Sequence, residues 1–130
     1  MKRTVGETLL EPHINYTNHV FKLLDAKIKI NGIAHITGGG LTENIPRILP
    51  NECSVKIQKG TWPSLPIFDT LKYLGNVEEE EMYQAFNMGV GMVFIVDSDS
   101  VDSIEKALKN ITNIYTIGEV VEGENIVHYN

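Results

Sequence analysis

Several features that would mark large classes of protein are scarce or missing in this sequence. Its one cysteine, Cys53, excludes an internal disulfide and favours a reducing compartment. No apolar run approaches the about 20 residues that a membrane-spanning helix needs. Residues 1–7 lack the apolar core of a secretion signal. These absences predict a cytoplasmic protein that does not use a membrane.

A basic excess is also missing. The chain has 11 Lys and Arg against 17 Asp and Glu, a net charge of -6, with no basic stripe and no interleaving of basic and aromatic residues. This balance argues against nucleic acid as a partner, whereas a phosphorylated small molecule needs only a few local donors. The 130 residues, 42% of them hydrophobic, suit one ordinary globular domain.

Hydrophobic periodicity and turn residues predict alternating helices and strands along the chain. Helices are expected at residues 14–24, 41–49, 67–74, about 78–85 and 101–109, and strands at 33–36, 55–57, 93–96, 114–121 and 125–128. Asn76 is expected to cap the fourth helix, and Asp99 or Ser100 the fifth. The first helix is preceded by a segment, residues 1–12, with no clear period.

This alternation predicts an α/β (α+β) fold in which a mixed sheet is layered with helices. A mixed sheet is expected because the last two strands read as a hairpin around residues 122–124. The apolar strand 93–96 is typical of a strand covered on both faces. We expect residues 1–12 to be an extended lead-in and residues 13–130 to form a single domain.

Three consecutive glycines, Gly38, Gly39 and Gly40, lie between a strand and a helix. Each glycine loses more backbone freedom on folding than any other residue, so such a loop needs a physical reason. One reason is the approach of bare N–H groups to an anion at the positive end of a helix, with the Thr37 hydroxyl beside them. The alternative is a tight structural turn where one backbone passes another.

Polar residues flank this loop on both sides. His35 ends the strand, where it could bind a ligand or act as an acid or base, or could simply bond the loop backbone. Asn44 and Arg47 lie on the following helix. Arg47 comes one turn after Glu43, so it forms either an ion pair with that residue or a phosphate clamp.

A second glycine pair precedes the strand at 93–96. Asn87, Gly89 and Gly91 lie there, and glycines at such places mark either a close backbone approach or a bulge. Packing against another loop is the reading that we favour slightly.

Metal and nucleotide signatures are missing from the sequence. The four consecutive acids at 78–81 fit a solvated first helical turn better than a metal site, and the four histidines have no zinc-type spacing. The glycine loop matches neither the P-loop nor the dinucleotide fingerprint. We expect no metal site and no cofactor in this chain alone.

Taken together, four segments resemble the C-terminal domain of the phosphoribosylformylglycinamidine cyclo-ligase (aminoimidazole ribonucleotide synthetase) family. They are GETLLEP at residues 6–12, AHITGGGL at 34–41, ENIPR at 43–47 and NMGVGM at 87–92. The resemblance covers nearly the whole chain, in the family's order, and the combination of motifs is specific.

The resemblance implies an ATP-dependent ligase of purine biosynthesis that closes the ring of formylglycinamidine ribonucleotide to give aminoimidazole ribonucleotide. It implies an N-terminal domain that holds most of the ATP and magnesium site and forms the dimer. It also implies that residues 37–40 cradle a substrate phosphate, with His35, Asn44 and Arg47 as neighbouring donors. The catalytic residues are not readable from the sequence.

The chain departs from the family pattern in two respects. The N-terminal domain is not part of this sequence, so we expect no catalysis by the chain alone and expect the face meant for that domain to favour self-association as a homodimer. His13 stands where the family usually has threonine in Pro-Thr-x-x-Tyr-Val. These departures leave a second reading open, a stand-alone, non-catalytic module that binds a phosphorylated ligand or regulates.

Overall fold

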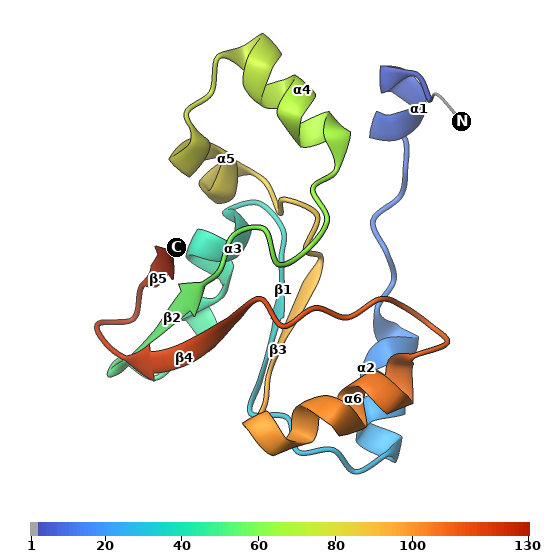
Figure 1. The fold of residues 1–130 in the computed structure, drawn as a ribbon, viewed down its shortest axis with the longest axis vertical. Coiled ribbons are helices and arrows are strands. Elements are labelled where there is room, and N and C mark those ends of the chain that lie inside the picture. The colour runs from blue at the N-terminus through green and yellow to red at the C-terminus, as the bar shows by residue number, and fades with distance from the viewer. Residues whose placement is uncertain (1–2) are drawn as a thin grey trace.

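A computed structural model describes residues 3–130 (Figure 1). In chain order its elements are α1 (Val5–Leu9), α2 (Thr17–Asp25), β1 (Gly32–His35), α3 (Gly40–Asn44), the 3-10 helix η1 (Pro46–Ile48), β2 (Cys53–Ile57), α4 (Pro66–Gly75), α5 (Glu79–Ala85), β3 (Met92–Ile95), the 3-10 helix η2 (Ser98–Ser100), α6 (Val101–Leu108), β4 (Gly118–Glu122) and β5 (Val127–Tyr129). The predicted mixture of helices and strands is confirmed. No helix among these residues is both long enough and apolar enough to span a membrane.

A two-stranded antiparallel ladder of β1 and β3 runs through the middle of the molecule (Figure 1). Its register pairs Gly32 with Ile95 and His35 with Met92. Successive side chains of a strand point to opposite faces. In β3 and the residue after it, Val93 and Ile95 therefore pack on one apolar cluster, and Phe94 and Val96 pack on another. The expected coverage of this strand on both faces is confirmed.

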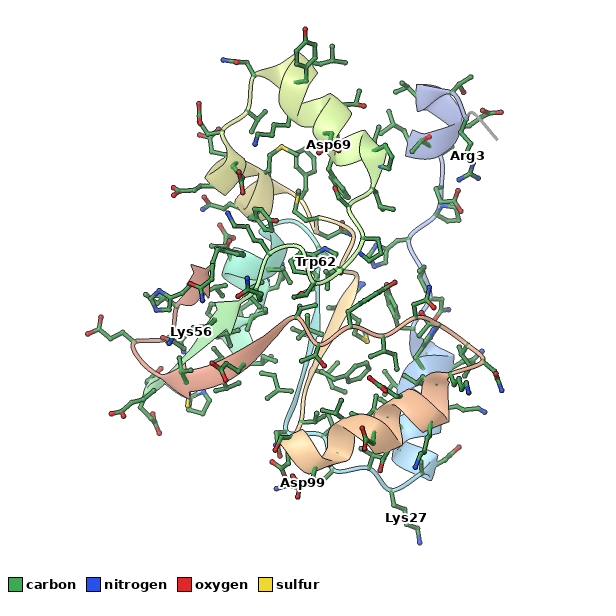
Figure 2. All side chains as sticks on the ribbon, in the orientation of Figure 1. Arg3, Lys27, Lys56, Trp62, Asp69 and Asp99 are labelled. Atoms are coloured by element: carbon green, nitrogen blue, oxygen red, sulfur yellow. The ribbon has the colours of Figure 1, made fainter. Side chains whose placement is uncertain are left out.

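The two clusters are built by different elements. The first gathers buried residues of β1, α3 and β2, together with Trp62, which lies in the centre of Figure 2. The second joins Leu23 of α2 to Ile104 and Leu108 of α6, the helix pair at the bottom of Figure 1. The ladder is thus the wall that the two clusters share.

The expected hairpin of the last two strands is wrong, although the mixed sheet is correct. In the second sheet the strand order is β4-β2-β5, with β2 antiparallel to β4 and parallel to β5. After β4 the chain crosses the end of β2, where Gly123 donates to the carbonyl of Glu52 and Asn125 to that of Cys53. The mostly buried β2 takes the central place because there both of its edges find hydrogen-bond partners.

The helix expected at 41–49 is divided. The α-helix spans Gly40–Asn44, and Pro46 then begins the 3-10 turn η1, which ends before Pro50. Proline has no N–H to donate back along an α-helix. Pro46 therefore lies at the break between the two helices.

Of the expected helix caps, the one at Asn76 is wrong. Asn76 adopts the left-handed conformation (φ 48°) and ends α4, while Glu78 occupies the first cap position of α5. Asparagine tolerates this backbone conformation better than most residues, which makes it a natural helix end. At α6, Ser100 occupies the expected N-cap position, although it also ends η2 and its side chain makes no cap hydrogen bond.

The lead-in, expected to be extended, contains the short helix α1. Thr4 and Glu7 form a reciprocal capping box, the local signal that the hydrophobic pattern did not reveal. None of its residues is buried, and an extended segment joins it to α2 (Figure 1). Residues 1–2 of the lead-in lie outside the described part of the chain.

Removal of residues 1–12 tests whether the domain is self-sufficient from residue 13. Because α1 buries no residue, we expect the free energy of unfolding in urea to change by less than about 0.5 kcal/mol. The control is Leu23→Ala in the full chain. Leu23 is 0% exposed, and its truncation is expected to lower stability by about 2–5 kcal/mol. A comparable loss on removal of residues 1–12 would place this segment inside the folding unit.

Candidate functional site

The glycine loop, defined here as residues 37–40, follows directly on the central ladder. The Ile36 N–H donates to the carbonyl of Gly91 at 2.9 Å, which extends the contact between the two chain segments beyond β1. The loop then turns through Gly39 (φ 96°) and Gly40 (φ 56°). The turn closes when the Gly40 N–H donates to the carbonyl of Thr37 at 3.0 Å.

At two of the three positions a side chain is disfavoured both by the positive φ and by neighbouring atoms that leave no room for a Cβ. A Cβ at Gly40 would lie 2.1 Å from the backbone oxygen of Tyr83, and one at Gly39 would lie 2.7 Å from a carboxylate oxygen of Glu43. Gly38 is different, because a Cβ there would meet nothing within 4 Å. The tight-turn interpretation therefore holds for Gly39 and Gly40, and Gly38 faces open space.

Bare N–H groups gather at this open side. Among residues 3–130 no hydrogen-bond acceptor faces the N–H of Thr37, Gly38 or Gly39. Thr37 and Gly38 are exposed, so their donors are accessible from solvent. Successive free N–H groups in a turn make a concave site for an anion. Because α3 has only five residues, the loop donors and not a helix dipole give the site its character.

The buried side chain of Asn44 binds the backbone of the loop. It is 5% exposed, and its amide donates to the carbonyls of Gly40 at 2.8 Å, Gly38 at 3.2 Å and Thr37 at 3.4 Å. These bonds turn the loop carbonyls inward. In this arrangement the side chain that was expected to be a ligand donor supports the loop instead.

Arg47 forms the ion pair that its spacing suggests. Its guanidinium lies 3.9 Å from a carboxylate oxygen of Glu43 and donates to the side-chain oxygen of Asn44 at 3.2 Å. Gln84 donates to the other oxygen of Glu43 at 3.2 Å. Arg47 thus partly offsets the charge of the Glu43 carboxylate, which lies against the loop and would repel an anion.

His35 meets a residue that lies 22 positions earlier. Its Nε2 lies 2.9 Å from the Nε2 of His13, and the Tyr16 ring stands edge-on to both imidazoles. Burial raises the pKa of Tyr16 above its usual value, which keeps the phenol neutral. Sequence reasoning missed this pairing; its only signal was His13 itself, a departure from the family pattern.

The second glycine loop supports the same region. The side chain of Asn87 accepts from the Gly89 N–H at 3.0 Å and fixes a turn in which Gly89 has φ 87°. A Cβ at Gly91 would lie 2.0 Å from the Tyr16 hydroxyl, so this glycine makes room for the tyrosine. In the structure, Gly91 serves packing, whereas Gly89 permits the turn.

The acidic run at 78–81 contacts lysines. Glu79 accepts from Lys59 at 2.6 Å and lies 3.5 Å from Lys72. The hydrogen bond from Lys59 is the main cause that lowers the pKa of Glu79. Across residues 3–130, no three His, Cys, Asp or Glu side chains come together in a way that could hold a metal ion.

Two alanine substitutions separate the two kinds of glycine in the loop. Gly40→Ala drives a methyl group into the Tyr83 carbonyl at positive φ, and we expect it to lower the free energy of unfolding by about 2–5 kcal/mol. Gly38→Ala is the matched control, expected to stay within about 0.5 kcal/mol. Urea denaturation measures both. Equal effects of the two substitutions would contradict the described loop packing.

Nearly the whole chain is similar to known proteins. Residues 2–130 match the family described as AIR synthase related protein, C-terminal domain. Phosphoribosylformylglycinamidine cyclo-ligase of Caldanaerobacter subterraneus subsp. tengcongensis is 50% identical over 123 residues, which are 94% of this chain and 36% of the relative. The enzyme of the same name from Acetivibrio thermocellus is 50% identical over 119 residues, 91% of this chain and 35% of the relative.

The chain thus spans about a third of the length of these curated relatives. Among solved structures, Escherichia coli HypE, a hydrogenase maturation protein, aligns with a TM-score of 0.66 at 20% identity, over 88% of this chain and 35% of that one. At this identity the likeness shows the fold alone. The match to residues 2–130 shows that the chain belongs to the family of AIR synthase related C-terminal domains.

Proposed function

We propose that this chain is the substrate-side part of a phosphoribosylformylglycinamidine cyclo-ligase. In this role the glycine loop binds the phosphate of formylglycinamidine ribonucleotide, and the complete enzyme closes the ring with ATP in purine biosynthesis. The observation that carries the proposal is a set of three N–H groups, at Thr37, Gly38 and Gly39, that find no acceptor among residues 3–130 and lie on the open side of a loop in a chain of this family. The lone Cys53 favours a cytoplasmic setting.

The surrounding residues support the phosphate role in different ways. Asn44 keeps the loop carbonyls away from the anion, because its buried amide binds three of them. Arg47 pairs with Glu43, which reduces the repulsion between that carboxylate and an anion at the loop. The Thr37 hydroxyl and the exposed ring of His35 complete the donors on the accessible side.

ATP and magnesium belong, in this proposal, to the N-terminal domain of the complete enzyme. Mg²⁺ prefers carboxylate and phosphate oxygens, and the carboxylate of Glu43 beside the loop already contacts Arg47 and Gln84. When bound, ATP would supply the phosphoryl group that activates the substrate oxygen. The residues of this chain would hold and orient the substrate.

The partner face includes α1 and the segment that follows it. Val5, Leu9 and Leu10 are 55%, 60% and 83% exposed, and α1 buries none of its residues. Apolar side chains exposed in this way suit a surface that another domain covers. We assign this surface to the N-terminal ATP-binding domain. Without that domain, self-association as a homodimer is the expected result.

Reconstitution tests the enzymatic proposal. The purified chain is mixed with the part of the Caldanaerobacter relative that precedes its match to this chain, and phosphate release is followed with ATP and formylglycinamidine ribonucleotide. We expect no turnover by either part alone, turnover by the mixture, and a change from homodimer to mixed complex by light scattering. Phosphate binding without turnover in a mixture that has assembled would instead favour a non-catalytic binding or regulatory module.

A charge placed at Gly38 tests the glycine loop. Gly38→Glu puts a carboxylate beside the free N–H groups, in open space, and Gly38→Gln is the neutral control of the same size. Inorganic phosphate is titrated by NMR, with the amides of Gly39 and Thr37 as reporters. We expect Gly38→Glu to bind about fivefold more weakly than Gly38→Gln, a loss of about 1 kcal/mol. Equal affinities, or shifts confined to other residues, would contradict phosphate binding at this loop.

A further inference from the structure

The contact between His13 and His35 restricts the protons that the two rings can carry. Their Nε2 atoms are 2.9 Å apart, so one must donate and the other accept. The pair keeps this hydrogen bond when it is neutral and when it carries one extra proton. A second extra proton would turn both Nε2 atoms into donors and separate the rings. The two imidazoles therefore share one bridging proton.

The pair lies on the same face of the chain as the free donors of the loop. Alternate residues of an extended strand point to the same side, and His35 and Thr37 are two residues apart. Both are exposed, whereas Ala34, before His35, and Ile36, between the two, are buried. A proton taken up by the pair thus adds positive charge beside the site proposed for phosphate.

Other titratable groups lie around the pair. The ring centroid of Tyr16, the N-cap residue of α2, lies 5.9 Å from that of His13 and 6.4 Å from that of His35, and the ring centroid of His19 lies 5.3 Å from that of Tyr16. Two residues before His13, Glu11 pairs with Arg3. Across the loop, Glu43 and Arg47 pair with each other. Within the described chain the buried Nδ1 of His19 has no hydrogen-bond partner, so the ring signal of His19 has to be distinguished from those of the pair.

We propose that His13 is a further binding residue, and that the His13–His35 pair takes up a proton when a phosphate group binds to the glycine loop. This inference rests on the proposed function of that loop. Histidine changes its charge between about pH 5 and pH 8, so binding strengthens as the pH falls through this range. Uptake of one proton changes the affinity by up to about tenfold per pH unit.

The physical reason is mutual stabilisation. A bound dianion favours the imidazolium form of nearby histidines, and by linkage the imidazolium favours the dianion equally. A single histidine would stabilise the dianion through only one Nε2 donor. The pair offers two rings whose shared hydrogen bond opens when the anion replaces it, so both Nε2 atoms can donate to ligand oxygens.

The experiment uses the full chain and sulfate, which stays a dianion from pH 6 to pH 8, whereas phosphate itself takes up a proton. Sulfate is titrated at three pH values by NMR, and the ring signals of the four histidines are followed with the backbone amides. We expect the affinity to rise about fivefold or more from pH 8 to pH 6. We also expect sulfate to raise the titration midpoints of both His13 and His35.

Two variants isolate the pair. His13→Gln retains a hydrogen-bonding side chain that does not titrate, and His13→Thr restores the residue of the family pattern. Both leave Tyr16 and His19 in place. We expect each variant to lose at least half of the gain in sulfate affinity that the parent chain shows between pH 8 and pH 6. His13 is exposed, so its replacement leaves the fold intact.

The outcomes distinguish this inference from the function on which it rests. If the Gly38 and Gly39 amides do not respond to sulfate at any pH, phosphate binding by the loop is refuted. If they respond but His13→Gln keeps the full pH dependence, the loop binds and the role of His13 is refuted. A midpoint shift confined to His19 or to His35 alone would also overturn the assignment of His13.

Discussion

The antiparallel ladder of β1 and β3 is the constraint on which the rest of this domain depends. It has only two strands, and it is held in place by apolar side chains of β3 that alternate between two clusters. A two-stranded ladder is marginal in water by itself. Here its stability comes from coverage on both faces, by α3 and β2 on one side and by α2 and α6 on the other. Loss of either cluster would therefore expose the ladder.

The candidate site inherits its geometry from the end of this ladder. Ile36 and Gly91 continue the contact beyond the paired strands, which brings the two glycine-containing loops together. The missing side chain at Gly91 gives Tyr16 its place, and Tyr16 in turn stands against His13 and His35. The glycines thus act by letting neighbouring groups approach, and the free N–H groups at residues 37–39 are a consequence of how the loop is folded over Asn44.

Local elements of this fold could be predicted from the sequence because their signals are local. The helix of residues 101–108 and the strand of 92–95 follow from periodicity and apolar runs. The place of β2 between β4 and β5 could not be predicted in that way, since it depends on contacts far apart in the chain. At the site, the glycine loop was recognisable from its motif. The inward role of Asn44 and the meeting of His13 with His35 depend on tertiary structure, which no spacing rule encodes.

The openness of the glycine loop defines what this chain can do without a partner. Hydrogen bonds to an anion in water replace bonds that both groups already make with water, so each contributes little. The same donors gain strength when a second wall excludes solvent and lowers the effective dielectric constant. Thr37 and Gly38 lie exposed on this chain, and the chain spans about a third of the curated cyclo-ligase relatives. If the loop binds phosphate as proposed, tight binding therefore requires a second wall that covers the loop and excludes water.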